Sequence, residues 1–84
     1  MNTDLKNEII NILKKYAINK KIFENLPENP HITNDLKINS ARMVDIVIDV
    51  EEHYNIEIEN ENLKNLIYLN DIVLLIEQKI KDKK

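Results

Sequence analysis

Few residues of this chain could do chemistry, and most of them lie in its middle third. The sequence has no cysteine and only two histidines, His31 and His53. Without cysteine there is no thiolate nucleophile, no disulfide and no cysteine zinc site. A histidine-based triad would also need an orienting acid and a shaped cleft. We therefore expect both histidines to be ordinary surface residues, with no catalytic residue and no metal site.

Paired carboxylates are present, but their spacing is that of an open helix face. Asp45 and Asp49 are four residues apart, and Glu52 follows on the same side. Such a face does not enclose the carboxylates as acid–base catalysis requires. Residues 31–60 hold two cations against seven acids, a net −5 in a chain whose total charge is −3. Nucleic acids and anionic membranes attract the opposite sign, so we expect neither as a partner, and a basic partner surface instead.

Ser40 has two interpretations from its local sequence. Asn39 and Ser40 are both good helix N-caps, because either side chain can accept a hydrogen bond from an unpaired first-turn N–H. If Ser40 caps the helix, its role is structural. If Asn39 caps it, the Ser40 hydroxyl is free at a helix start, where the dipole and the N–H groups favour an attached phosphate.

Hydrophobic spacing predicts the helices that position these residues. We expect helices over residues 3–16, from Asn39 or Ser40 to Tyr54, over 60–66, and from Tyr68 or Asn70 to a fraying KDKK end. Asn55 should end the second of these helices in the left-handed conformation. The core positions expected on the first helix are Leu5, Ile9, Ile12, Leu13 and Tyr16. Those expected on the second and last helices are Met43, Val47, Val50, Tyr54, Ile72, Val73, Ile76 and Ile80.

The connections carry their own apolar residues. Residues 17–39 are predicted to be a long loop with a helical turn near 20–24, pinned to the core by apolar side chains, which are Ile18, Ile22, Phe23, Leu26, Ile32, Leu36 and Ile38. Ile56 and Ile58 alternate with glutamates as in a strand, but no second strand pattern exists to pair with them. We therefore expect an extended link whose isoleucines point inward.

The chain of 84 residues is long enough for one small domain, residues 1–84. Its expected fold class is all-α, with three main helices, one short helix and a long first loop. The opening MNTDLKNEII lacks the basic and then apolar pattern of a signal peptide, and no apolar run reaches membrane-spanning length. We expect a cytoplasmic monomer.

The stretch DLKINSARMVDIVIDVEEHYNIEI, residues 35–58, resembles the signature of the acyl carrier proteins. That signature is Asp-Leu, two residues, Asp-Ser-Leu, and a helix ending in acidic residues and an aromatic. The positions in register are Asp35, Leu36, Ser40, Glu51, Glu52, Tyr54 and Ile58. The resemblance implies a small four-helix bundle, not an enzyme. It also implies 4′-phosphopantetheine from coenzyme A esterified to Ser40, holding an acyl group as a thioester.

The resemblance also implies partners and further site residues. The partners would be a phosphopantetheinyl transferase and acyl-transferring or synthase enzymes with basic docking patches. The expected docking residues are Asn39, Ala41, Val44, Asp45, Ile48, Asp49 and Glu52. The expected acyl pocket is formed by Val44, Ile48, Leu63, Leu66 and Ile72.

Three residues beside the serine depart from the family pattern. Asn39 replaces an aspartate, Lys37 a glycine and Ala41 a leucine. These changes suggest a dedicated carrier for a specialised acyl or polyketide-type pathway. The fatty-acid pathway is the other candidate. Two alternatives stay open: an aminoacyl or peptidyl carrier, and an unmodified protein-interaction module. A small hydrolase is disfavoured because no nucleophile and base are organised together.

Overall fold

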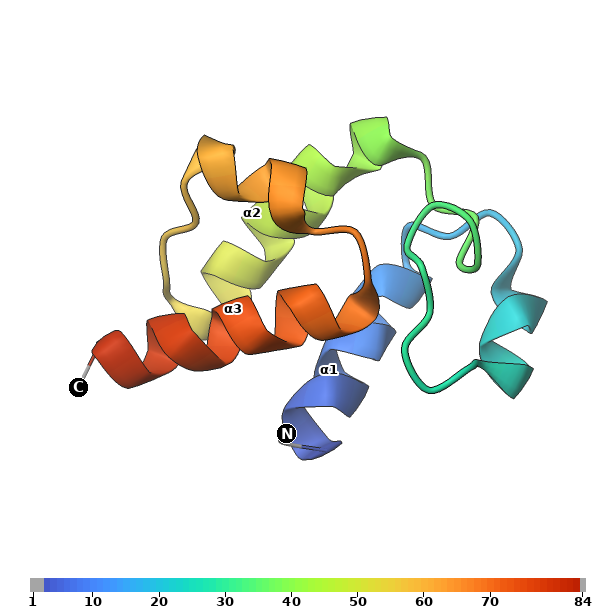
Figure 1. Cartoon of the computed structure of the whole chain (residues 1–84), viewed down its shortest axis with the longest axis horizontal. Coiled ribbons are helices and arrows are strands. Elements are labelled where there is room, and N and C mark those ends of the chain that lie inside the picture. Colours follow the sequence, from blue (N-terminus) through green and yellow to red (C-terminus); the bar gives the residue numbers. More distant parts are fainter. Residues whose placement is uncertain (1–2, 84) are drawn as a thin grey trace.

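The computed structural model describes residues 3–83, and these residues form α-helices joined by short 3₁₀ helices (Figure 1). In chain order the elements are α1 (Thr3–Lys14), η1 (Lys20–Asn25), η2 (Ser40–Arg42), α2 (Met43–Tyr54), η3 (Asn60–Asn65) and α3 (Leu69–Asp82). The predicted all-α helical bundle is confirmed, and η3 is the predicted short helix. No helix among residues 3–83 is long and apolar enough to cross a membrane.

Helix α1 packs against both α2 and α3, so it forms the centre of the bundle. Four residues of the predicted stripe, Leu5, Ile9, Ile12 and Leu13, are buried, and the fifth, Tyr16, is partly buried and follows the helix. The helix ends at Lys14, two residues before the predicted end at Tyr16. The next two N–H groups, of Lys15 and Tyr16, donate to carbonyls three residues back, at 3.2 and 3.0 Å. This tighter turn closes the helix.

Helix α2 buries Met43, Val47 and Val50 as predicted, and in addition Ile46, which the predicted core face did not include. It begins at Met43, after the 3₁₀ turn η2, whereas a single helix from Asn39 or Ser40 was expected. Its predicted end is confirmed. Asn55 lies in the left-handed region with φ 55° and ψ 53°, and its N–H donates to the Glu51 carbonyl.

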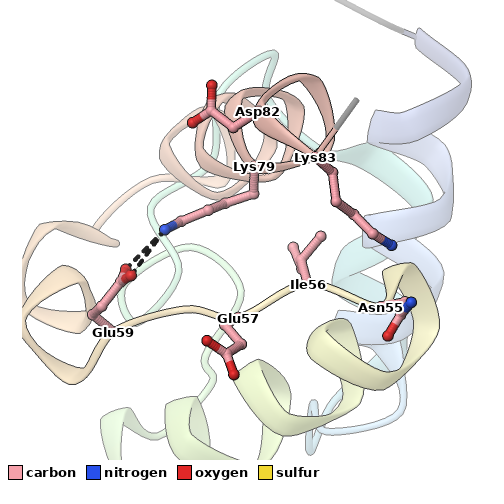
Figure 2. Close-up of a pocket in the computed structure, with 7 residues that line it drawn as sticks. All are labelled: Asn55, Ile56, Glu57, Glu59, Lys79, Asp82 and Lys83. Atoms are coloured by element: carbon pink, nitrogen blue, oxygen red, sulfur yellow. Dashed lines mark hydrogen bonds and ion pairs between the residues drawn. The ribbon is translucent and has the colours of Figure 1, made fainter.

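The link after α2 is extended, and Ile56 and Ile58 are buried, as expected. Two side chains fix this link. The Glu51 carboxylate accepts a hydrogen bond from the Ile58 N–H at 2.8 Å. Figure 2 shows Lys79 of α3 reaching across an open hollow to Glu59, and its ammonium group donates to both carboxylate oxygens at 3.1 and 2.9 Å. The hydrogen bond from Lys79 holds the pKa of Glu59 below its usual value.

The long first loop is held by backbone hydrogen bonds to the segment before α3. Ile32 N–H donates to the Ile67 carbonyl and Leu69 N–H to the Pro30 carbonyl, both at 2.9 Å. Between them His31 and Tyr68 form an isolated antiparallel bridge. Ile32, Leu36 and Ile38 are buried, and Ile22, Phe23 and Leu26 are partly buried, as predicted. The prediction for Ile18 was wrong: this residue, in the connection between α1 and η1, is 89% exposed.

Helix α3 buries Leu69, Ile72, Val73 and Ile76. Tyr68 precedes it, as one of the two predicted starts requires, and the Asp71 carboxylate accepts hydrogen bonds from the N–H groups of Ile67 and Tyr68 at 3.1 and 2.9 Å. The predicted fraying of KDKK was wrong for its first residues, since the helix continues through Asp82. Lys84 lies outside the described residues.

Candidate functional site

The loop that leads to Ser40 is a compact turn organised by His31. The His31 carbonyl accepts hydrogen bonds from the N–H groups of Asp35 and Leu36 at 2.8 and 3.1 Å. Its ring nitrogen Nδ1 accepts one from the Asn34 N–H at 3.0 Å. The Asp35 carboxylate accepts one from the His31 N–H at 2.8 Å. His31 is therefore a half-buried structural residue, contrary to the expectation of an ordinary surface histidine. The other histidine, His53, is exposed.

Lys37 has an unusual backbone for its residue type. Its φ is 56°, in the left-handed region, where a side chain with a Cβ is strained. The neighbours on both sides, Leu36 and Ile38, are fully buried, so the chain must turn sharply at the residue between them. The acyl carrier protein signature has glycine at this position, and glycine adopts this conformation without strain.

Ser40 is the first residue of η2, and its side chain is exposed. The capping role belongs to Asn39, whose side-chain Oδ1 accepts a hydrogen bond from the Ala41 N–H at 2.9 Å. Within the part of the chain that the structure describes, the Ser40 hydroxyl makes no hydrogen bond. Of the two interpretations of Ser40, this geometry favours the free hydroxyl.

An apolar hollow of about 570 Å³ opens beside Ser40. Its apolar lining comes from the first loop, the start of α2, η3 and the segment after it, and consists of Ile32, Met43, Val44, Leu63, Leu66 and Ile67. The polar residues His31, Thr33, Ser40 and Lys64 complete the lining. Volumes of this size are typical of small-molecule sites, and apolar walls with few polar groups suit an aliphatic chain.

The structure brings Val44, Leu63 and Leu66 of the expected acyl pocket into this hollow, but not Ile48 or Ile72. Ile72 is only 3% exposed and belongs to the core. Ile48 is 48% exposed and lines a different hollow, between α2 and the end of α1. The lining of the Ser40 hollow takes residues only from the first turn of α2, one turn before Ile48. Ile32 and Ile67 were not foreseen, because the connecting segments that carry them have no regular period, and Met43 was expected only as a core residue of α2.

The expected docking residues differ in what they contact. Asn39, Ala41, Val44, Asp45, Ile48 and Glu52 are exposed, whereas Asp49 is half buried. The Asp49 carboxylate accepts hydrogen bonds from the Tyr16 hydroxyl at 2.9 Å and from the Lys15 ammonium at 3.2 Å. Asp45 pairs with Arg42 at 3.3 Å. The acidic face of α2, formed by Asp45, Asp49 and Glu52, is thus partly neutralised by its own neighbours.

The contact between α1 and α2 shifts the pKa values of its members. The hydrogen bond from Tyr16 holds the pKa of Asp49 below its ordinary value, with help from Lys15 and against the effect of burial. The same hydrogen bond raises the pKa of Tyr16. At the other end of α2, burial and then a hydrogen bond of 2.8 Å to Glu8 raise the pKa of Tyr54. All these shifts favour the bonded, ionised carboxylate and the neutral phenol.

The fold and site define a small all-α domain that presents a free serine at the start of a helix. Comparison with known proteins gives a consistent result. The chain is 40% identical over 77 residues to the acyl carrier protein homolog of Mycoplasmopsis pulmonis, which covers 92% of this chain and 97% of that protein. It is 41% identical over 46 residues to the acyl carrier protein of Kineococcus radiotolerans, covering 55% of this chain and 57% of that protein. No family model and no solved structure matches the chain.

The first of these relatives spans nearly the whole of both chains, so the likeness includes the serine turn, α2 and the closing helix. This chain belongs to the acyl carrier protein family. The resemblance drawn from the motif around Ser40 is thereby confirmed at the level of the family.

Proposed function

We propose that this protein is an acyl carrier and not an enzyme, with 4′-phosphopantetheine attached to the Ser40 hydroxyl. The observation that carries the proposal is that Asn39 caps the turn, which leaves the exposed Ser40 hydroxyl without a structural role. Ser40 is also the only serine in the sequence. The bound group would supply a thiol that holds an acyl cargo as a thioester.

The residues around Ser40 fit such a group. Ser40 is exposed, so an enzyme can reach it, and it is one of the residues that line the apolar hollow. Val44, Leu63 and Leu66 would then shield the cargo from water, since each buried methylene contributes up to about 0.8 kcal/mol. The apolar walls favour an acyl cargo over the aminoacyl alternative, because a charged amine would lose its hydration there.

The partners in this proposal are a phosphopantetheinyl transferase and the enzymes that load and unload the cargo. Asp45 and Glu52 are exposed on the side of α2 that begins beside Ser40. A basic patch on a partner would be attracted to these carboxylates and oriented by them. Asn39 and Ala41 flank the serine and would lie under any enzyme that reaches it.

The experiment is to incubate the chain with coenzyme A and a phosphopantetheinyl transferase and to measure its intact mass. The wild-type chain should gain one phosphopantetheine, and Ser40→Ala should gain none while keeping its helicity and melting temperature, since Asn39 retains the cap. A matched control, Ser40→Ala with Ala41→Ser, keeps one serine in the turn but moves it to another face, and it should also stay unmodified. A wild-type chain that gains no mass would favour the unmodified interaction module.

A further inference from the structure

A second hollow, of about 340 Å³, also lies beside the Ser40 turn and shares no lining residue with the apolar hollow. It is formed where the end of α1 meets η2, and its lining residues are Lys15, Tyr16, Ile18, Asn39 and Arg42. We call this the basic corner. Asn39 and Arg42 stand one residue before and two residues after Ser40, so the basic corner adjoins the attachment serine directly.

The two cations of the basic corner are available to a partner. Lys15 and Arg42 have side chains that are 62% and 61% exposed. Their ion pairs with Asp49 and Asp45, at 3.2 and 3.3 Å, are surface pairs, which contribute little and can be exchanged for other partners. The basic corner therefore presents two exposed cations, each paired with a carboxylate of the acidic face of α2.

Ile18 adds an apolar contact point at the same place. Its side chain is 89% exposed, the most open of the exposed large apolar residues among those that the structure describes. A single exposed isoleucine is ordinary on a protein surface. Here it shares a hollow with two cations and the residue before the serine, and this combination suits a complementary protein surface more than solvent.

We propose that the enzyme that modifies Ser40 also docks on the basic corner, with a carboxylate opposite Arg42 and an apolar side chain against Ile18. This inference rests on the proposed function of Ser40. A protein partner with a standard interface buries about 800 Å² on each side, much more than one turn of helix, so an enzyme that acts on Ser40 must cover Asn39 and Arg42. A partner surface that is basic throughout would be repelled there, because like charges in contact are unfavourable. The charge of the partner's surface must therefore change from basic to acidic at this point.

The test uses the direction of a rate change. We expect Arg42→Glu to lower kcat/KM for phosphopantetheine transfer roughly tenfold at low salt, and Arg42→Gln to lower it less, because a cation that contacts a carboxylate is lost or reversed. Ile18→Asn should lower the rate roughly threefold. If the partner recognised only acidic residues, Arg42→Glu would add a negative charge to the docking face and would speed the reaction. The two possibilities thus predict opposite signs.

Matched controls are available on α3, away from the serine. Lys81→Glu makes the same charge change, and Leu74→Asn the same type of polarity change at a half-exposed residue, and neither should alter the rate. Circular dichroism and the melting temperature should match wild type for every variant compared. Wild type that gains mass, together with Arg42→Glu that reacts as fast or faster, would overturn this inference alone. Wild type that gains no mass would overturn the proposed function and this inference with it.

Discussion

The Tyr16 hydroxyl donates a hydrogen bond of 2.9 Å to the Asp49 carboxylate, which joins the end of α1 to the middle of α2. Asp49 was expected to serve docking, together with Asp45 and Glu52. In the folded protein its carboxylate also accepts a hydrogen bond from Lys15, so it lies at the contact between the two helices. Of the three carboxylates, Asp45 and Glu52 are the exposed ones that a partner can approach.

Removal of this hydroxyl should weaken the contact between α1 and α2. We expect Tyr16→Phe to lower the free energy of unfolding by about 1 kcal/mol at pH 7, the usual contribution of such a hydrogen bond. Asp45→Asn is the matched comparison, since it removes a more exposed carboxylate interaction on the same helix and should change stability by less than about 0.5 kcal/mol. Urea unfolding of the three proteins measures both effects. Equal stabilities of Tyr16→Phe and wild type would show that the bond contributes nothing in solution.

The same contact predicts a pH dependence. The folded-state pKa of Asp49 is lower than its unfolded value of about 3.9, so its stabilising contribution is present above that pH and is lost as the pH falls through the lower folded-state pKa. The folded-state pKa of Tyr16 is raised, so its contribution is present below about pH 10 and is lost above. The stability difference between wild type and Tyr16→Phe should therefore be constant near neutral pH and shrink in acid. Carboxyl NMR titration should show Asp49 titrating at higher pH in Tyr16→Phe, and an unchanged titration would contradict the assignment.

Lys37 offers a test of backbone strain beside the site. Because the φ of Lys37 is 56°, Lys37→Gly should raise the free energy of unfolding by roughly 0.5–1 kcal/mol. This gain is the strain energy that glycine removes from the folded state, minus the entropy cost of the greater freedom of glycine in the unfolded chain. Lys37→Ala keeps a Cβ and should give no such gain. Asn55→Gly is the matched control, since Asn55 has φ 55° but asparagine tolerates this region, and its gain should be smaller. A gain for Lys37→Ala equal to that for glycine would point to the charge of Lys37 as the cause.

The apolar hollow predicts how a loaded protein should melt. If the cargo enters it, the melting temperature should rise from a short to a medium acyl chain, since each buried methylene contributes at most about 0.8 kcal/mol. Val44→Asn should remove this rise, because Val44 lines the hollow. Ile48→Asn is the matched control: Ile48 is similarly exposed, one turn further along α2, and lines the other hollow, so the rise should remain. A rise that depends on Ile48 and not on Val44 would place the cargo elsewhere.

The exposed carboxylates of α2 predict an electrostatic approach of partners. Replacing Asp45 and Glu52 together by lysine should slow phosphopantetheine transfer roughly tenfold at low salt, since exposed pairs contribute about 0.2–1 kcal/mol each and the charge is reversed. The ratio of the wild-type transfer rate to that of the double variant should decrease as the salt concentration rises, because salt screens exposed charges. Modification of the double variant at the wild-type rate in low salt would exclude this face, and recognition would then run through Asn39, Ala41 and the first loop.

Much of the helical framework could be predicted because amphipathic spacing is a local property. The stripe of α1 at Leu5, Ile9, Ile12 and Leu13 and the end of α2 at Asn55 depend only on neighbouring residues, and both were predicted correctly. The sequence likewise predicted the position of Ser40 in its motif. It also indicated that Asn39 could cap the helix in place of Ser40, and Asn39 does so in the structure.

Contacts between distant segments could not be predicted in this way. The hydrogen bonding of Asp49 depends on Tyr16, 33 residues earlier. No hydrophobic period in either segment indicates that the two side chains meet. His31 also forms an isolated bridge with Tyr68, 37 residues later, which no local pattern indicates. Val44 and Ile48 have similar exposure and similar sequence surroundings, yet they line different hollows, because the lining from η3 reaches only the first turn of α2. Sequence alone determined the amphipathic stripes and the place of Ser40 before a helix, since these follow from local chemistry. The tertiary structure alone decided which side chains share a cavity or an ion pair, because that depends on how the helices pack.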